Sequence, residues 1–346
     1  MRQLVTGLAR LLEQGSEAVL AVILDHAGST PRGSGSMMVV RPDGTMAGSV
    51  GGGPLEARVL SRAKDLFQER ASCLLRFDLG AREAADAGMV CGGEAVVLLD
   101  HLPADPDCAG VFRALAQSLN AGRPTTLATA FSMNGERLAA VSRKALDPDD
   151  GDPVLAAPLT LARRTGRPAS LAAPGSLTVV IPLAALKTAI LFGAGHVALH
   201  SAHLAAQVGF RTVVVDDRPE FANAGRFPLA DEVRVIPSFR DCLDGMAIGP
   251  DTFILILTRG HLHDKTVLAQ ALDTQAGYLG MIGSRRKRDA TYRALEAEGR
   301  DPSELERVHC PIGLSIDAET PEEIAVSIVA EMIQVRAGMG AGETAP

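Results

Sequence analysis

The residues with the clearest chemistry form a glycine-rich turn between an apolar strand and a helix. Gly193 and Gly195 follow the apolar run 189–192, and the small residue Ala198 stands three positions after the second glycine. In this Gly-x-Gly-x-x-Ala pattern the first glycine permits a tight turn, the second lets backbone N–H groups approach a phosphate, and the alanine lets the helix pack closely on its strand. The positive end of the helix dipole then faces the anion. The spacing therefore predicts a phosphate-binding Rossmann unit.

Two further residues near this turn are candidates for contact with the ligand. Asp216 ends the next apolar run, 212–215, near the offset of about 20 residues at which an acid binds a ribose hydroxyl in dinucleotide sites. His196 directly follows the second glycine and is placed to touch a ligand. These residues alone leave open whether the turn holds a dinucleotide or another phosphate compound.

A basic segment follows a later strand. Gly283 directly follows the apolar run 278–282, and Ser284, Arg285 and Arg286 come next and open a predicted helix. Cations at the start of a helix oppose its dipole, so the run is easiest to explain if an anion binds nearby. Because ligands bind outside the carboxyl ends of the strands in a doubly wound sheet, this segment is a candidate for the same site. The alternative is a solvated basic surface.

The segment 258–264 follows another predicted strand at the same edge. It contains His261, whose imidazole offers polar contacts or proton transfer to a ligand. The alternative is that Asp264 caps a helix and the histidines are solvated.

Glycines also gather at two places in the first hundred residues. Ser49, Gly51 and Gly52 stand between a strand and a helix, where their backbone N–H groups could cradle an anion or form a tight structural turn. Cys91 lies in a glycine-flanked turn before a strand. It is either a thiol ligand or a buried cysteine that packs as a small apolar residue.

The pattern of elements divides the chain into four parts. Residues 1–103 predict an α+β domain, and 104–186 predict a hairpin-containing extension and linker, rich in Pro, Asp and Ala. Residues 187–338 alternate strand and helix, which predicts a doubly wound parallel sheet. Residues 339–346 are expected to be a disordered tail. The fold class is therefore α/β, with an N-terminal α+β domain followed by a Rossmann-like domain.

The expected elements follow from apolar periodicity and turn residues. In the first domain they are helices at 3–13 and 55–69 and strands at 18–24, 36–40, 45–50 and 95–99. In the Rossmann-like domain the strands are 189–192, 211–215, 233–236, 253–257 and 278–282. A capping box at 320–323, with proline at the first helical position, starts a last helix that should end near Gly338.

Composition limits the class of protein. The 346 residues carry a net charge of −7 and only 3% aromatic side chains, which argues against a nucleic-acid partner. The longest apolar run, 177–186, contains Pro182 and is too short to span a membrane. The five cysteines form no Cys-x-x-Cys pair, and the first residues lack the apolar core of a signal peptide. We therefore expect a soluble cytoplasmic protein.

Together these motifs make the chain similar to the XdhC/CoxI family of xanthine dehydrogenase accessory proteins. The resemblance extends from about residue 15 to 335 and owes little to the middle region. Its motifs are 48–53, 88–93, 192–198, 258–264, 280–287, 311–314 and 320–325.

The resemblance implies a cofactor chaperone rather than an enzyme. Members of the family bind the molybdenum cofactor, or molybdopterin, protect it while a cysteine desulfurase supplies the terminal sulfur, and deliver it to the molybdenum subunit of apo-xanthine dehydrogenase, an enzyme of purine catabolism. A homodimer is also expected. The resemblance further implies that Cys91 contacts the cofactor molybdenum, since a soft thiolate suits this metal.

Two other classes of function stay open. An NAD-dependent oxidoreductase would use the Gly193 turn and Asp216 as a dinucleotide site. Neither Tyr278 nor Tyr292 has a lysine four residues on, so a Tyr-x-x-x-Lys proton-donor pair is missing, although His261 could replace it. The third possibility is a protein-binding scaffold without a ligand, for which flexible glycines at two strand ends would be a poor design.

Overall fold

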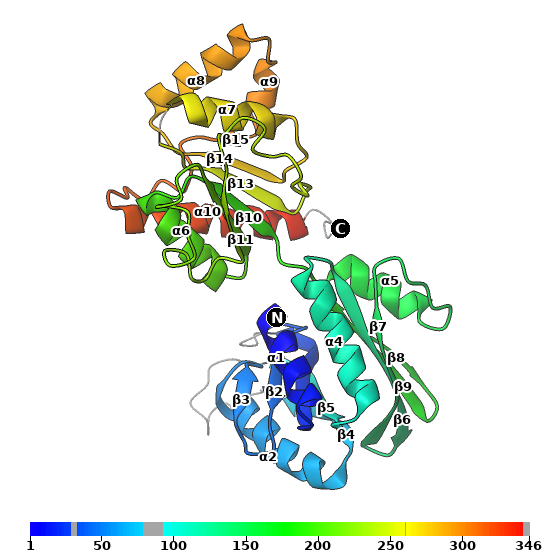
Figure 1. Ribbon diagram of the computed structural model, residues 1–346. Coiled ribbons are helices and arrows are strands. Elements are labelled where there is room, and N and C mark those ends of the chain that lie inside the picture. Colours follow the sequence, from blue (N-terminus) through cyan, green and yellow to red (C-terminus); the bar gives the residue numbers. More distant parts are fainter. Residues whose placement is uncertain (29–32, 79–92, 260, 342–346) are drawn as a thin grey trace. The chain divides into compact units, whose positions relative to one another are not determined.

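The computed structural model describes residues 1–28, 33–78, 93–259 and 261–341. The chain forms two compact units, Met1–Ala185 and Leu186–Pro346 (Figure 1). Each unit has its own sheet and its own buried apolar clusters, so each is described by itself. Among the described residues, no helix is both long and apolar enough to cross a membrane.

In the described part of the first unit, nine strands form one sheet in the order β3-β2-β1-β5-β4-β7-β6-β9-β8, and neighbouring strands pair antiparallel. The strands are β1 (Ala18–Gly28), β2 (Met37–Val40), β3 (Met46–Gly48), β4 (Ser72–Asp78), β5 (Gly93–Leu102), β6 (Thr125–Asn134), β7 (Arg137–Leu146), β8 (Ala169–Ala173) and β9 (Ser176–Leu183). The helices are α1 (Arg2–Glu13), α2 (Gly53–Glu69), α4 (Pro106–Asn120) and α5 (Ala156–Thr165).

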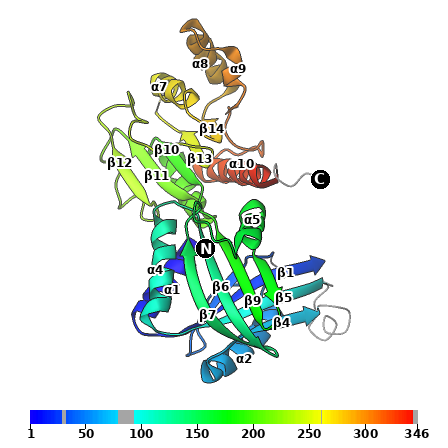
Figure 2. The ribbon, with the colours of Figure 1, turned by 90° about the vertical axis from the view of Figure 1, so that its right-hand side faces the viewer.

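Helices cover both faces of this sheet, which explains why consecutive residues of β1 are buried. Leu20 and Val22 pack with α1 and α4 in one cluster, whereas Val19 and Ile23 pack with α2 in another. Figure 2 shows α1 and α4 side by side. Strands β6 to β9 come from the segment 104–186, which we expected to be an extension; they continue the sheet of the first unit.

The described part of the second unit holds a parallel sheet of six strands in the order β12-β11-β10-β13-β14-β15. The strands are β10 (Thr188–Phe192), β11 (Arg211–Asp216), β12 (Glu232–Val235), β13 (Thr252–Ile256), β14 (Tyr278–Met281) and β15 (Val308–His309). The helices are α6 (His196–Gln207), α7 (His261–Leu272), α8 (Arg285–Ala297), α9 (Pro302–Leu305) and α10 (Pro321–Ala341). This strand order is that of a dinucleotide-binding Rossmann fold.

The parallel sheet is doubly wound, as the sequence predicts. Leu191 packs in a cluster with Ala198 of α6 and Met332 of α10, and Phe192 packs on the other face with Leu268 of α7 and Leu295 of α8. Figure 1 shows α6 and α10 on one side of the strands and α7 and α8 on the other. The five predicted strands match within one residue at each end; the short β15 was not predicted.

The predicted capping box at the start of α10 is present. The backbone N–H of Thr320 donates to Glu323 Oε2 at 3.1 Å, and the Glu323 N–H donates back to Thr320 Oγ1 at 3.3 Å. The helix continues to Ala341, beyond Gly338, where its end was predicted. Of the expected tail, residues 342–346 lie outside the described residues.

Candidate ligand site at the carboxyl edge of the parallel sheet

The glycine-rich turn lies at the point where the strand order of the parallel sheet reverses. From the central strands β10 and β13, the order runs β11 and β12 on one side and β14 and β15 on the other. In such sheets, ligands bind outside the carboxyl ends of the two central strands. Gly193 follows β10 there with φ +108°, and a Cβ at this position would lie 2.3 Å from the carbonyl oxygen of Leu257. Only glycine therefore fits between the ends of β10 and β13.

The second glycine of the turn has open space in front of it. Gly195 is the N-cap of α6 with an ordinary φ of −71°, and no atom lies within 4 Å of the position that a Cβ would take. His196, the first residue of the helix, is exposed, whereas Ala198 is only 1% exposed and packs in the core. The space beside the Cα of Gly195 is therefore open at the start of α6, and helix starts of this kind bind phosphate groups.

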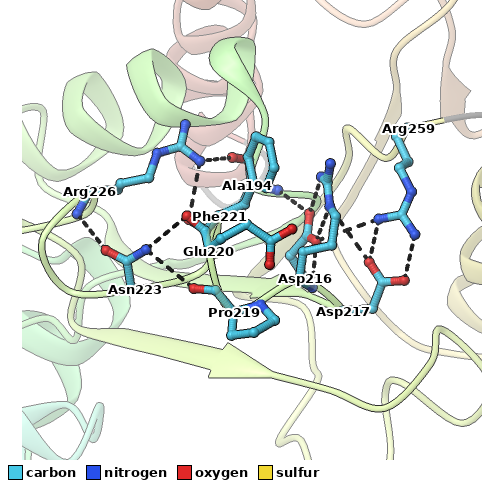
Figure 3. Close-up of polar contacts among 10 residues, drawn as sticks. Ala194, Asp216, Asp217, Pro219, Glu220, Phe221, Asn223, Arg226 and Arg259 are labelled. Atoms are coloured by element: carbon cyan, nitrogen blue, oxygen red, sulfur yellow. Dashed lines mark hydrogen bonds and ion pairs between the residues drawn. The ribbon is translucent and has the colours of Figure 1, made fainter.

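Asp216, the predicted ribose-binding acid, is bonded within the protein itself (Figure 3). Its Oδ2 accepts the backbone N–H of Ala194 at 2.7 Å and Arg218 Nη2 at 2.9 Å. Its Oδ1 accepts Arg218 Nε at 2.9 Å and the Arg218 backbone N–H at 3.0 Å. Burial raises the pKa of this carboxyl, but the bonds from Arg218 and Ala194 outweigh it and lower the pKa to about 2.

Two more arginines surround the turn. Arg226 Nη1 donates to the carbonyl oxygen of Ala194 at 3.1 Å, and the guanidinium lies 4.8 Å from the ring centre of Phe221. Arg259, after β13, forms a two-pronged ion pair with Asp217 at 2.6 and 2.8 Å. Figure 3 shows these side chains on either side of Asp216. Sequence reasoning missed Arg218 and Arg226 as residues near the turn. For Arg218 a signal existed, since it stands two residues after the acid that ends β11.

A buried acid connects the segments that follow β13 and β14. Asp264 is fully buried, accepts the Thr258 hydroxyl at 2.5 Å, and forms an ion pair with Lys287 Nζ. Lys287 also donates to the carbonyl oxygen of Ile282 at 3.1 Å. Asp264 is therefore neither a solvated residue nor a simple helix cap, because it connects the loop after β13 with the first turn of α8.

The predicted basic segment lies at the start of α8. Ser284 is the N-cap of this helix and its hydroxyl accepts the backbone N–H of Lys287 at 3.3 Å. Arg285 and Arg286 are exposed at the first two helical positions. His261 begins α7, but its side chain lies outside the described residues.

In the first unit, the protein itself fills the glycine cradle. Glu56 Oε1 accepts the hydroxyl of Ser49 at 2.6 Å, the N–H of Gly52 at 2.9 Å and the N–H of Val50 at 3.2 Å. The N–H of Gly51 donates to Ser49 Oγ at 3.1 Å. The bond from the Ser49 hydroxyl lowers the pKa of Glu56. In this structure the predicted anion cradle is a turn closed by a carboxylate of the next helix.

The cysteine that the resemblance places near molybdenum, Cys91, lies outside the described residues. The four described cysteines, Cys73, Cys108, Cys242 and Cys310, are free and buried. Burial raises the pKa of each thiol, to about 12 for Cys108 and about 11 for Cys242 and Cys310. No group of three metal-binding side chains occurs within the part of the chain that the structure describes.

Models of known protein families match parts of both units. The model of the XdhC Rossmann domain covers residues 189–332, and the model of the XdhC and CoxI family covers residues 11–78. The chain belongs to the XdhC/CoxI family. The Rossmann match starts in β10 and includes the whole candidate site, from the Gly193 turn to the start of α8.

Three relatives are similar over almost all of the chain. It is 30% identical to "Uncharacterized protein YqeB" of Escherichia coli K12 over 96% of this chain but 46% of that protein, so it spans about half the length of this relative. It is 29% identical to a probable xanthine dehydrogenase subunit of Bacillus subtilis 168, over 96% of this chain and 97% of that one. It is 24% identical to "Molybdenum cofactor insertion chaperone PaoD" of Escherichia coli K12, over 94% of this chain and 85% of that protein.

A solved structure has the same fold. The crystal structure described as a xanthine dehydrogenase from Bacillus halodurans superposes with a TM-score of 0.76 and 28% sequence identity. The match covers 96% of both chains. The combination of an N-terminal unit and a Rossmann unit is therefore shared along the whole length of the two proteins.

Proposed function

We propose that this protein binds the molybdenum cofactor and delivers it to an apo-xanthine dehydrogenase. The observation on which this rests is the open start of α6 at Gly195, set among arginines in the Rossmann unit of an XdhC/CoxI chain. One relative is named a cofactor insertion chaperone and another is named as a probable part of a xanthine dehydrogenase. The first name points to the insertion of the molybdenum cofactor and the second to xanthine dehydrogenase as the enzyme concerned.

The phosphate of the pterin is the part of this cargo that the described residues suit best. It would be held by the backbone N–H groups after Gly195, with the imidazole of His196 beside it. The exposed guanidinium groups of Arg285 and Arg286 would add charge from the start of α8. Asp216 and Ala198 would act indirectly, by fixing the turn and the helix.

The metal-bearing end of the cofactor requires a softer contact, which we assign to Cys91. A thiolate binds molybdenum, and the four described cysteines are buried with raised thiol pKa values, so they are poor thiolates at neutral pH. Cys91→Ala should release the metal-bearing cofactor faster while metal-free molybdopterin stays bound. The matched control is Cys242→Ala, which should change neither release rate.

The delivery step is tested by transfer under anaerobic conditions. The purified full-length chain is loaded with molybdenum cofactor, treated with a cysteine desulfurase and cysteine, and mixed with apo-xanthine dehydrogenase. We expect xanthine oxidation activity to appear faster than with the same amount of free cofactor. Equal rates with and without the protein would contradict the proposed delivery role.

The chain would thus act as a carrier and not as a catalyst. The NAD-dependent oxidoreductase considered from the sequence is less well supported, because one relative is named a molybdenum cofactor insertion chaperone. The bonds already made by Asp216 also disfavour a dinucleotide ligand.

A further inference from the structure

The carboxylate of Asp216 has no acceptor position left for a ligand. An ionised carboxylate offers about four lone-pair positions, two on each oxygen. All four are used, by the backbone N–H groups of Ala194 and Arg218 and by Nε and Nη2 of the Arg218 side chain. The Asp216 side chain is only 2% exposed. Both oxygens are therefore satisfied by the protein and shielded from water.

The arginine that covers this carboxylate is itself held in place. Its guanidinium binds both oxygens of Asp216 in a fork, which is the geometry in which arginine pairs most strongly with a carboxylate. It also lies 3.9 Å above the ring centre of Phe221 and 3.8 Å from Asp217. Arg218 is 22% exposed, so its guanidinium reaches solvent while the carboxylate to which it is bonded does not.

This arrangement differs from what a dinucleotide requires at the same position. In a Rossmann site for NAD, the acid at the end of the second strand accepts hydrogen bonds from the ribose hydroxyls. Here a ribose could bond to Asp216 only after the two side-chain bonds from Arg218 had broken, and such charge-assisted bonds are the strong ones. The fold is that of a dinucleotide site, but its ribose contact is occupied.

We propose that Arg218 determines ligand specificity, by closing Asp216 to ribose hydroxyls so that the site accepts a phosphate monoester and rejects adenine dinucleotides. The ligand class is a phosphorylated compound that has no ribose diol at this position. This inference depends on the proposed function only for the location of the ligand at the Gly193 turn. The rejection of dinucleotides can be measured without any pterin.

The experiment measures binding of ADP-ribose, NADH and NADPH to the full-length chain by calorimetry. The wild type is compared with Arg218→Ala, which frees two acceptor positions on Asp216. Arg259→Ala is the matched control: it also removes one positive charge beside Asp216, but it leaves all four bonds to that carboxylate intact. Circular dichroism confirms that each variant is folded.

We expect the wild type and Arg259→Ala to bind ADP-ribose and NADH at least tenfold more weakly than Arg218→Ala does. Tight binding of NADH or NADPH by the wild type would overturn the proposal. If the wild type binds NADPH tightly and Arg218→Ala has lost this affinity, the arginine binds the 2′-phosphate instead. A folded Arg218→Ala variant with no gain for ADP-ribose would also overturn it. Molybdopterin binding, measured separately on the wild type, tests the proposed function and is independent of these outcomes.

Discussion

The carboxylate of Asp216 accepts the backbone N–H of Ala194 at 2.7 Å, across 22 residues of sequence. Asp216 ends β11, and Ala194 is the central residue of the turn that follows β10. The end of β11 thereby fixes the glycine-rich turn that follows the neighbouring strand β10. The turn is set by the protein before any ligand binds, which lowers the entropic cost of binding.

The first prediction concerns the stability that this contact supplies. Asp216→Asn replaces an acceptor-only group by an amide and leaves buried donors without good partners, so we expect a loss of about 3 kcal/mol in unfolding free energy. Thermal unfolding followed by circular dichroism measures it. The control is Asp217→Asn, whose partner Arg259 is 43% exposed; it should cost less than about 1 kcal/mol. Equal losses in the two variants would contradict this role for Asp216.

The second prediction is a dependence on pH. The pKa of Asp216 is about 2 in the folded chain, below the value of about 3.9 expected for an unfolded aspartate. The lowered pKa therefore contributes its full share of the unfolding free energy above about pH 4. This share, of order 2 kcal/mol, is lost as the pH falls towards 2. The difference in melting temperature between wild type and Asp216→Asn should shrink over this range. A constant difference from pH 5 to pH 2.5 would argue against the lowered pKa.

The third prediction concerns the ion pair of Lys287 with Asp264. Lys287→Met should lower the unfolding free energy by about 3 kcal/mol or more, because it leaves the fully buried Asp264 without its ion-pair partner. The double variant Lys287→Met/Asp264→Leu should regain most of this loss, since it replaces the unpaired buried acid by an apolar side chain. A double variant as unstable as the single one would mean that the effect comes from packing. Urea unfolding of both variants separates the two cases.

The sequence was sufficient to predict the backbone of the site. The Gly-x-Gly-x-x-Ala spacing and the apolar strands around it predict the turn at Gly193 and the parallel sheet, because these depend on local periodicity and on steric limits. The strand β15 was missed because its two residues, Val308 and His309, are too few to form a pattern. Helix α4 was also missed, although Asp105 and Pro106 give a standard N-cap signal.

The side-chain partners within the site could not be predicted in the same way. Asp216 has the position of a ribose-binding acid, but no spacing rule shows that Arg218 folds back onto it. Asp264 pairs with Lys287 of another helix, α8, and this tertiary contact leaves no local pattern in the sequence. For Glu56 a weak signal existed, because an acid in the first turn of α2 can reach back to the preceding glycines.

Two substitutions at Gly195 test directly whether the phosphate binds at the start of α6. Asn and Asp are almost isosteric, both are favourable N-cap residues, and the φ of −71° suits either. Asp also suits the helix dipole, so Gly195→Asp should fold at least as stably as Gly195→Asn. The two variants differ mainly in a negative charge placed where the phosphate is proposed to bind.

Equilibrium binding of molybdopterin to both variants and the wild type, under anaerobic conditions, gives the answer. We predict tight stoichiometric binding by the wild type and binding by Gly195→Asp at least tenfold weaker than by Gly195→Asn, because only the carboxylate repels the phosphate. Equal affinities of the two folded variants would contradict the placement of the phosphate at the start of α6. Absence of molybdopterin binding by the wild type would contradict the proposed function itself.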